Sequence, residues 1–123
     1  DQLMEQHLLY EDFKRLSWQK QLGNLASTLA TISTQSKIPL QDELTSNLLR
    51  EVALMIEWCA IQVPSEFHWE LAAMQRECLN WHRVFPVEDV RSILAMNTRH
   101  YSDRVLDMAG LLETEEALSI VNF

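Results

Sequence analysis

Hydrophobic residues recur along most of the chain at alternating steps of three and four, the spacing of one face of an α-helix. The clearest pattern follows Pro64 and comprises Phe67, Leu71, Met74, Cys78, Trp81 and Phe85. Pro39, Pro64 and Pro86 fall between such patterns, and proline usually marks a helix boundary. The sequence therefore predicts four helical segments, at residues 2–35, 40–62, 65–85 and 87–112.

The connections between these segments are short, which favours neighbouring helices that run in opposite directions. Glycine and proline are scarce, with two and three residues, whereas a fold rich in strands needs many turns. A chain of 123 residues with 47% apolar residues can bury a core without a metal or a disulfide. We therefore predict one all-α domain over residues 1–123, an antiparallel up-down-up-down four-helix bundle with a long N-terminal helix.

The first segment carries two apolar faces that point in roughly opposite directions. At about 100° per residue, one face holds Trp18, Leu22, Leu25, Leu29 and Ile32. The other holds Leu9, Phe13 and Leu16, and no proline or glycine separates the two groups. Either the helix breaks near Ser17, or one continuous helix turns the second face away from its own bundle. We favour the continuous helix, which predicts that Leu9, Phe13 and Leu16 bind a protein partner, most simply a second copy of the chain.

Two of the four tryptophans, Trp58 and Trp69, lie off the main apolar faces of their segments. Half-exposed tryptophans are enriched at protein interfaces, so we expect both to join the partner contact. The remaining two, Trp18 and Trp81, lie on apolar faces and are expected in the core.

The last segment interrupts its apolar face with Asn97 and Tyr101. The predicted face comprises Val90, Ile93, Leu94, Asn97, Tyr101, Val105, Met108 and Leu112. Counting residues back through the turns brings Glu57 and Arg104 close to this interruption, which predicts a buried polar cluster of Glu57, Asn97, Tyr101 and Arg104. Such a cluster fixes the register of a bundle. Alternatively, Tyr101 and Arg104 line the pocket of a small-ligand sensor.

The stretch from Arg76 to His82, "RECLNWH", resembles the Arg-x4–6-His motif of HEPN-type four-helix ribonucleases. The resemblance implies that Arg76 and His82 act on an RNA phosphodiester at a dimer interface. On one continuous helix, however, residues six apart point about 120° away from each other. This ribonuclease or nucleotide-binding function is therefore the alternative to a non-enzymatic interaction or regulatory domain.

The net charge of −8 argues against nucleic acid or an anionic membrane as the main partner. The greasiest run, residues 52–63, is too short for a membrane span of about 20 residues. Cys59 and Cys78 are expected to be staggered by roughly 13 Å, too far for a disulfide, which favours reduced thiols in a cytoplasmic protein. We find no pattern typical of a metal site, a cofactor site or a catalytic nucleophile, so the sequence predicts none of them.

Overall fold

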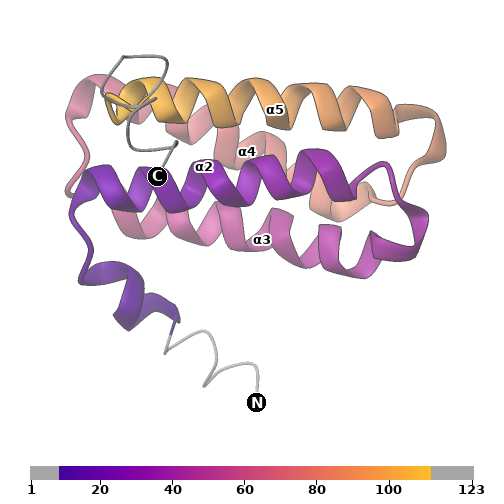
Figure 1. The fold of residues 1–123 in the computed structure, drawn as a ribbon, viewed down its shortest axis with the longest axis horizontal. Helices are drawn as coiled ribbons and strands as arrows, with labels where there is room; N and C mark the ends of the chain where they lie inside the picture. Colours follow the sequence, from indigo (N-terminus) through magenta and orange to yellow (C-terminus); the bar gives the residue numbers. More distant parts are fainter. Residues whose placement is uncertain (1–8, 112–123) are drawn as a thin grey trace, which may run out of the picture.

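The computed structural model describes residues 9–111, and this part of the chain contains helices and no strand. Its long helices are α2 (Trp18–Gln35), α3 (Asp42–Cys59), α4 (His68–Val84) and α5 (Arg91–Met108). They lie side by side along the long axis of the molecule (Figure 1). The predicted all-α class is thus confirmed for the described residues.

Each proline connection contains one turn of 3-10 helix just before the next long helix. These turns are Pro39–Gln41, Ser65–Phe67 and Glu88–Val90. α5 is followed by Gly110, whose φ of 77° lies in the left-handed region that favours glycine. Leu111 then donates to the carbonyl of Leu106 at 2.8 Å and closes the helix end.

α2 and α5 form a closely packed pair that is joined by two hydrogen bonds between a side chain and the facing backbone. The Ser33 hydroxyl of α2 donates to the Ala95 carbonyl at 2.5 Å, and the Ser102 hydroxyl of α5 donates to the Ala26 carbonyl at 2.8 Å. All four residues are small and buried. Since Ser33 faces Ala95 and Ala26 faces Ser102, the two helices run in opposite directions.

α3 and α4 are tied together in the same manner. The Gln75 amide donates to the Ala53 carbonyl at 2.9 Å, and the His82 ring contacts the Ser46 carbonyl at 2.8 Å. Both residues of each helix are again seven positions apart, which is two helical turns. These two helices therefore also run in opposite directions, and α2 packs against α3 to join the two pairs.

α4 and α5 are consecutive in the chain but hardly approach each other by their backbones. The space between them is crossed by longer polar side chains from both helices. The molecule thus consists of two tightly tied helix pairs and one loosely closed seam between α4 and α5.

The prediction of one continuous N-terminal helix is wrong. The helix ends after residue 14, and Ser17 adopts an extended conformation with φ −62° and ψ 157° as the N-cap of α2. The Ser17 hydroxyl accepts from the Lys20 amide at 3.3 Å, and the Gln21 side chain donates to the Phe13 carbonyl at 3.1 Å. Serine capping and the glutamine amide therefore stabilise a break that needs neither proline nor glycine.

Because of this break, Phe13 turns into the core of its own chain and is only 3% exposed. Leu9 and Leu16 are half-buried beside it. The ring of Phe13 lies 5.9 Å from that of Trp58, which also makes an edge contact with Tyr10 at 5.3 Å. The expectation that Phe13 and Trp58 belong to an outward contact surface is corrected accordingly, since Phe13 is buried and Trp58 packs against the core. Leu9 and Leu16 line a recess beside Phe13.

The core is one cluster to which every long helix contributes. Leu22, Leu25, Leu29 and Ile32 of the predicted α2 face are all buried in it. Cys59 and Cys78 are also buried and both are free thiols. Burial raises the pKa of Cys59 to about 11 and that of Cys78 to about 12, so both stay protonated and unreactive.

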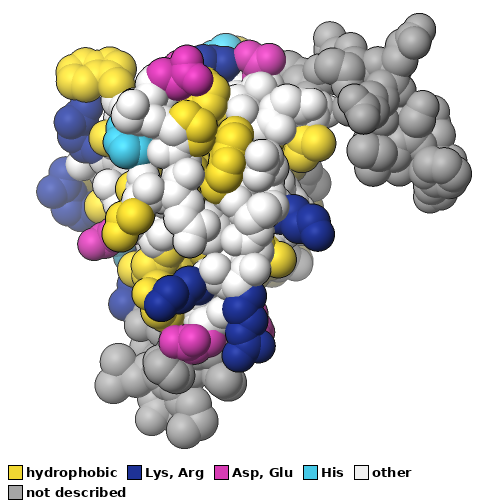
Figure 2. All heavy atoms as spheres, turned by 90° about the vertical axis from the view of Figure 1, so that its left-hand side faces the viewer, with side chains coloured by type: hydrophobic (Ala, Val, Ile, Leu, Met, Phe, Trp, Pro, Cys, Tyr) yellow, Lys and Arg dark blue, Asp and Glu magenta, His cyan; other side chains and the backbone are white. Residues whose placement is uncertain are grey.

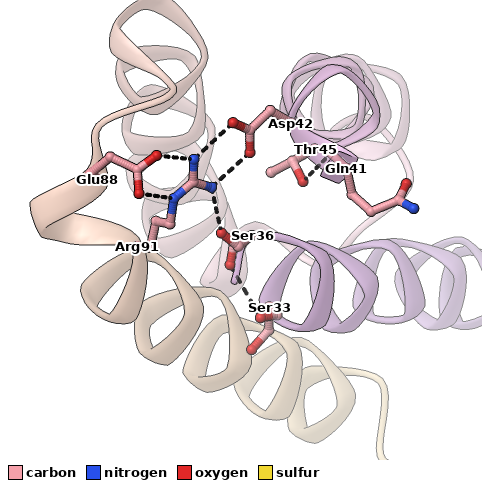
Figure 3. A network of polar contacts seen from close by, with 7 residues as sticks. All are labelled: Ser33, Ser36, Gln41, Asp42, Thr45, Glu88 and Arg91. Carbon is pink, nitrogen blue, oxygen red and sulfur yellow. Dashed lines mark hydrogen bonds and ion pairs between the residues drawn. The ribbon is translucent and has the colours of Figure 1, made fainter. Parts of the chain in front are cut away.

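One arginine ties three segments together at the end of the molecule where α5 begins (Figure 3). Arg91 is 8% exposed, and its guanidinium donates to both oxygens of Asp42 at 2.7 and 2.8 Å. It also donates to both oxygens of Glu88 and to the Ser36 carbonyl at 3.0 Å. Every donor of the guanidinium is satisfied, so Arg91 closes the end of α2 and the beginnings of α3 and α5.

This network predicts that the protein loses stability in acid. Hydrogen bonding to Arg91 lowers the pKa of Asp42 and Glu88 below their ordinary values of 3.8 and 4.5. A carboxylate with a lowered pKa in the folded state stabilises the fold above its ordinary pKa, and this contribution is lost as the pH falls through the lowered value. Glu51 acts in the opposite direction, because burial raises its pKa. We expect the urea midpoint to fall as the pH drops from 5 to 3.

The variant Arg91→Met tests the source of this acid sensitivity. We expect a lower urea midpoint than wild type at pH 7 and a smaller further loss between pH 5 and 3. Arg104→Met, which removes a more exposed arginine, provides a second variant that keeps the core intact. If the urea midpoint of both variants fell between pH 5 and 3 by as much as that of wild type, the arginine–carboxylate pairs would not be the source of the acid sensitivity.

Candidate functional site

The seam between α4 and α5 holds most of the polar side chains that meet across two helices. α4 contributes Glu70 and Glu77, and α5 contributes Asn97, Tyr101 and Arg104. All five are half-buried. The seam therefore combines polar groups with partial access to solvent.

Glu77 is the centre of the inner part of this seam. Its carboxylate accepts from the Asn97 amide at 3.1 Å, from the Trp81 indole at 3.3 Å and from the Tyr101 hydroxyl. Burial, followed by the hydrogen bond to Glu77, raises the pKa of Tyr101 above its ordinary value of 10. Tyr101 thus remains a donor at neutral pH, and Glu77 holds α5 at a fixed distance from α4.

Glu70 and Arg104 close the outer part of the seam with a two-pronged ion pair. Arg104 donates to the two oxygens of Glu70 at 2.7 and 2.6 Å, and also to Asp107 at 2.6 Å. Hydrogen bonding to Arg104 lowers the pKa of Glu70. Both partners are about one-third exposed, so solvent weakens the pair and it fixes geometry more than it stabilises the fold.

A recess of about 160 Å³ opens beside this ion pair. It is lined by Trp69, Glu70, Ala73, Met74, His100, Tyr101 and Arg104. An enclosed cavity of about 150 Å³ takes up a benzene ring, so this recess has room for one side chain of a partner. Glu70, Tyr101 and Arg104 already have partners within the chain, which leaves shape, the apolar walls and the exposed His100 as its main means of recognition.

Three residues of the predicted cluster, Asn97, Tyr101 and Arg104, do lie in one polar seam, but they do not share one partner and Glu57 is not among them. Asn97 and Tyr101 share Glu77, whereas Arg104 pairs with Glu70. Glu57 is exposed on α3, where it lines a different recess together with His68. The prediction for Glu57 is wrong because two connections separate α3 from α5 in the chain, whereas the adjacent helix α4 places Glu70 and Glu77 opposite these residues.

The face of α5 that enters the core also differs from the predicted one. Its buried residues are Arg91, Leu94, Ala95, Thr98, Ser102, Val105 and Met108. Ile93, on the predicted face, is 46% exposed, and Leu112 lies outside the described residues. Small hydroxyl residues replace larger apolar ones because α2 lies so close to α5, and hydrophobicity alone does not reveal such positions.

Beside the seam, the solvent face of α4 carries an aromatic ring and two cations. Trp69 is 82% exposed, and Arg76 and Arg83 are also exposed. Within residues 9–111, the only arginines in ion pairs are Arg91 and Arg104. Arg83 instead donates to the Asn80 side chain at 2.9 Å.

Figure 2 views the end of the molecule where α3 connects to α4. Hydrophobic side chains on this end are interleaved with charged ones and do not form one continuous apolar patch. Ile61, at that connection, is 93% exposed. An interface that uses this end must therefore combine apolar and charged contacts.

The ribonuclease-like pair is not brought together within one chain. α4 is continuous from His68 to Val84, so it includes both Arg76 and His82. The His82 ring is directed at α3, where it contacts the Ser46 carbonyl at 2.8 Å and the Ser46 hydroxyl at 3.2 Å. Arg76 is exposed to solvent, whereas His82 faces α3. Within one chain the two side chains therefore do not converge on a common point where they could act on one phosphodiester.

The part of the chain that the structure describes contains no candidate metal site. No three His, Cys, Asp or Glu side chains gather there in a way that could hold an ion. In the same residues, none of the helices is long and apolar enough to cross a membrane. The best-formed candidate site is thus the α4–α5 face, defined here as Trp69, Ala73, His100 and the seam behind them, together with Arg76 and Arg83 on the adjoining solvent face of α4.

Comparisons with known proteins give no relative from which a function could be transferred: no family, no curated protein and no solved structure matches the chain.

Proposed function

We propose that this chain is a non-enzymatic helical protein–protein interaction domain that binds its partner through the α4–α5 face. The observation that carries the proposal is the exposure of Trp69, which is 82% accessible next to a recess that can receive a side chain. An exposed tryptophan makes little contribution to its own fold, and tryptophan and arginine are the residues most enriched at binding hot spots.

The proposal keeps the class of function that the sequence predicts and moves the contact surface from the first helix to α4 and α5. Self-association through Leu9, Phe13 and Leu16 loses its basis because Phe13 is buried. The small-ligand sensor finds less support, because the polar groups around Tyr101 and Arg104 already bond to Glu77 and Glu70. Likewise, a nuclease built on Arg76 and His82 has no geometric support in one chain.

As parts of the same proposal, we infer an up-down-up-down four-helix bundle over residues 1–123 and a reducing compartment such as the cytoplasm. Opposite directions of α2 and α5, and of α3 and α4, support the bundle. Free thiols at Cys59 and Cys78 are compatible with a reducing compartment.

Replacing Trp69 by alanine tests the proposal. We expect the variant to unfold within about 0.5 kcal/mol of wild type, since changes at exposed positions have small effects. In affinity capture from cell lysate, we expect it to lose proteins that wild type retains. The matched control is Ile61→Ser, which removes an even more exposed apolar side chain at the α3–α4 connection and should keep those proteins. Identical captured proteins for wild type and Trp69→Ala would contradict the proposal.

A further inference from the structure

We propose that the α4–α5 face binds an acidic amphipathic helix of a partner protein, whose carboxylates pair with Arg76 and Arg83 while an apolar side chain packs on Trp69. This inference rests on the proposed interaction function and specifies the chemistry of the partner. Spacing, uncompensated charge and the recess beside Trp69 support it.

The spacing suits a helix as the bound segment. Trp69, Arg76 and Arg83 are each seven residues apart, and an α-helix drifts only about 20° over seven residues. They therefore form a gently winding line along α4, with about 40° between Trp69 and Arg83. Ala73 and Asn80 lie between them and have short side chains, so a second helix can approach α4 closely.

Charge specifies an acidic segment. Ala72, Ala73, Leu79 and Asn80 occupy the positions three or four residues from Arg76, so α4 itself offers Arg76 no carboxylate. The acidic residues of α4 that are nearest in sequence, Glu70 and Glu77, bond to α5 instead. In a chain of net charge −8, Arg76 and Arg83 thus remain without an ionic partner among the described residues.

Apolar contact gives the bound helix its position. The recess of about 160 Å³ lies between Trp69 on α4 and His100 on α5, and Ala73 and Met74 line it. A leucine or similar side chain of the partner would fill it and would cover the indole of Trp69. Arginine pairs alone are weak at a solvent-exposed surface, so this contact supplies affinity and the arginines supply selectivity.

Single-stranded RNA is the competing ligand, because arginine binds phosphate and tryptophan stacks on bases. The observations favour a protein segment. A nucleic-acid backbone carries closely spaced negative charges and would be repelled by a chain of net charge −8. An acidic helix presents fewer charges and can match just two arginines.

The test uses the full chain and two designed helical peptides. One carries glutamates seven residues apart beside a line of leucines, and the other carries lysines in place of those glutamates. We expect the acidic peptide to bind the wild-type chain about tenfold more tightly than the lysine peptide, as measured by fluorescence anisotropy. Two exposed ion pairs predict a loss of about fivefold in Arg76→Ala/Arg83→Ala. Arg76→Glu/Arg83→Glu should instead prefer the lysine peptide.

The matched control is Lys20→Ala/Arg50→Ala, which removes two exposed cations from α2 and α3 and should leave binding unchanged. Equal binding of both peptides, absence of binding, or equal losses in the control would overturn the inference. Tighter binding of polyuridine RNA than of the acidic peptide, lost in Arg76→Ala/Arg83→Ala, would assign the face to nucleic acid and would also overturn the inference.

The two proposals can fail separately. If Trp69→Ala still loses captured proteins while the peptides show no charge preference, the interaction function stands and only the acidic partner is wrong.

Discussion

Replacing Phe13 by aspartate is expected to destabilise the fold by more than about 3 kcal/mol, because truncating a buried phenylalanine alone costs about 3–5 kcal/mol. Phe13 is 3% exposed and packs against Trp58, so aspartate would also bury a charge without a partner. With a typical stability of about 5–15 kcal/mol, much of the folded population would be lost on mild heating. Urea unfolding followed by circular dichroism measures this change.

Two controls separate burial from other effects. Phe13→Leu keeps an apolar side chain and should cost less than about 1.5 kcal/mol. Leu40→Asp introduces the same charge at a position that is 95% exposed and should change stability by no more than about 0.5 kcal/mol. If Phe13→Asp were as stable as wild type but changed the oligomeric state, Phe13 would belong to an outward contact surface on a continuous first helix, and our account of its burial would be wrong.

Enlarging Ser102 to leucine is expected to cost about 3 kcal/mol, the upper part of the usual range for overpacking a filled core. Ser102 is 3% exposed and its hydroxyl lies 2.8 Å from the Ala26 carbonyl, so α2 and α5 leave no room for a larger side chain. Leucine would force the pair apart and would also break the facing bond between Ser33 and Ala95. Thermal and urea unfolding measure the loss.

The controls at this site distinguish volume from hydrogen bonding. Ser102→Ala removes one hydrogen bond without adding volume and should cost about 1 kcal/mol. Asp103→Leu adds a leucine at the exposed neighbouring position and should be nearly neutral. A Ser102→Leu variant no less stable than Ser102→Ala would show that the α2–α5 pair is not closely packed.

The positions of α3, α4 and α5 follow from the sequence because the relevant signals are local. Each proline connection lies within a few residues of its predicted place, and the apolar faces of α2 and α4 enter the core largely as predicted. The break at Ser17 illustrates a limit. The change in apolar phase between Leu16 and Trp18 reveals it, but its stabilisation by Gln21 bonding to the Phe13 carbonyl is a tertiary contact.

The seam and the Arg91 network illustrate a second limit. Pairing of Arg104 with Glu70, and of Asn97 and Tyr101 with Glu77, depends on how far α4 and α5 stand apart. That distance follows from the small residues that draw α5 toward α2. Arg91 lies among the core positions of α5, but its hydrogen-bond partners come from three separate segments of the chain. No local sequence pattern therefore predicts this network.

The packing of the helices supports our proposal that a partner binds the α4–α5 face. The pairs α2–α5 and α3–α4 are fixed by hydrogen bonds into the facing backbone. α4 and α5 are held apart by side chains that meet across the seam, and Trp69 lies exposed beside it.

The most direct measurement is photo-crosslinking in cells with a photoreactive residue at position 73, between Trp69 and Arg76, and in a control at Asn47 on the exposed side of α3. We predict a discrete crosslinked protein at position 73 that is absent at position 47 and is lost when Trp69→Ala is added. No crosslink at position 73, or equal crosslinks at both positions, would contradict the assignment of α4 and α5 as the binding face.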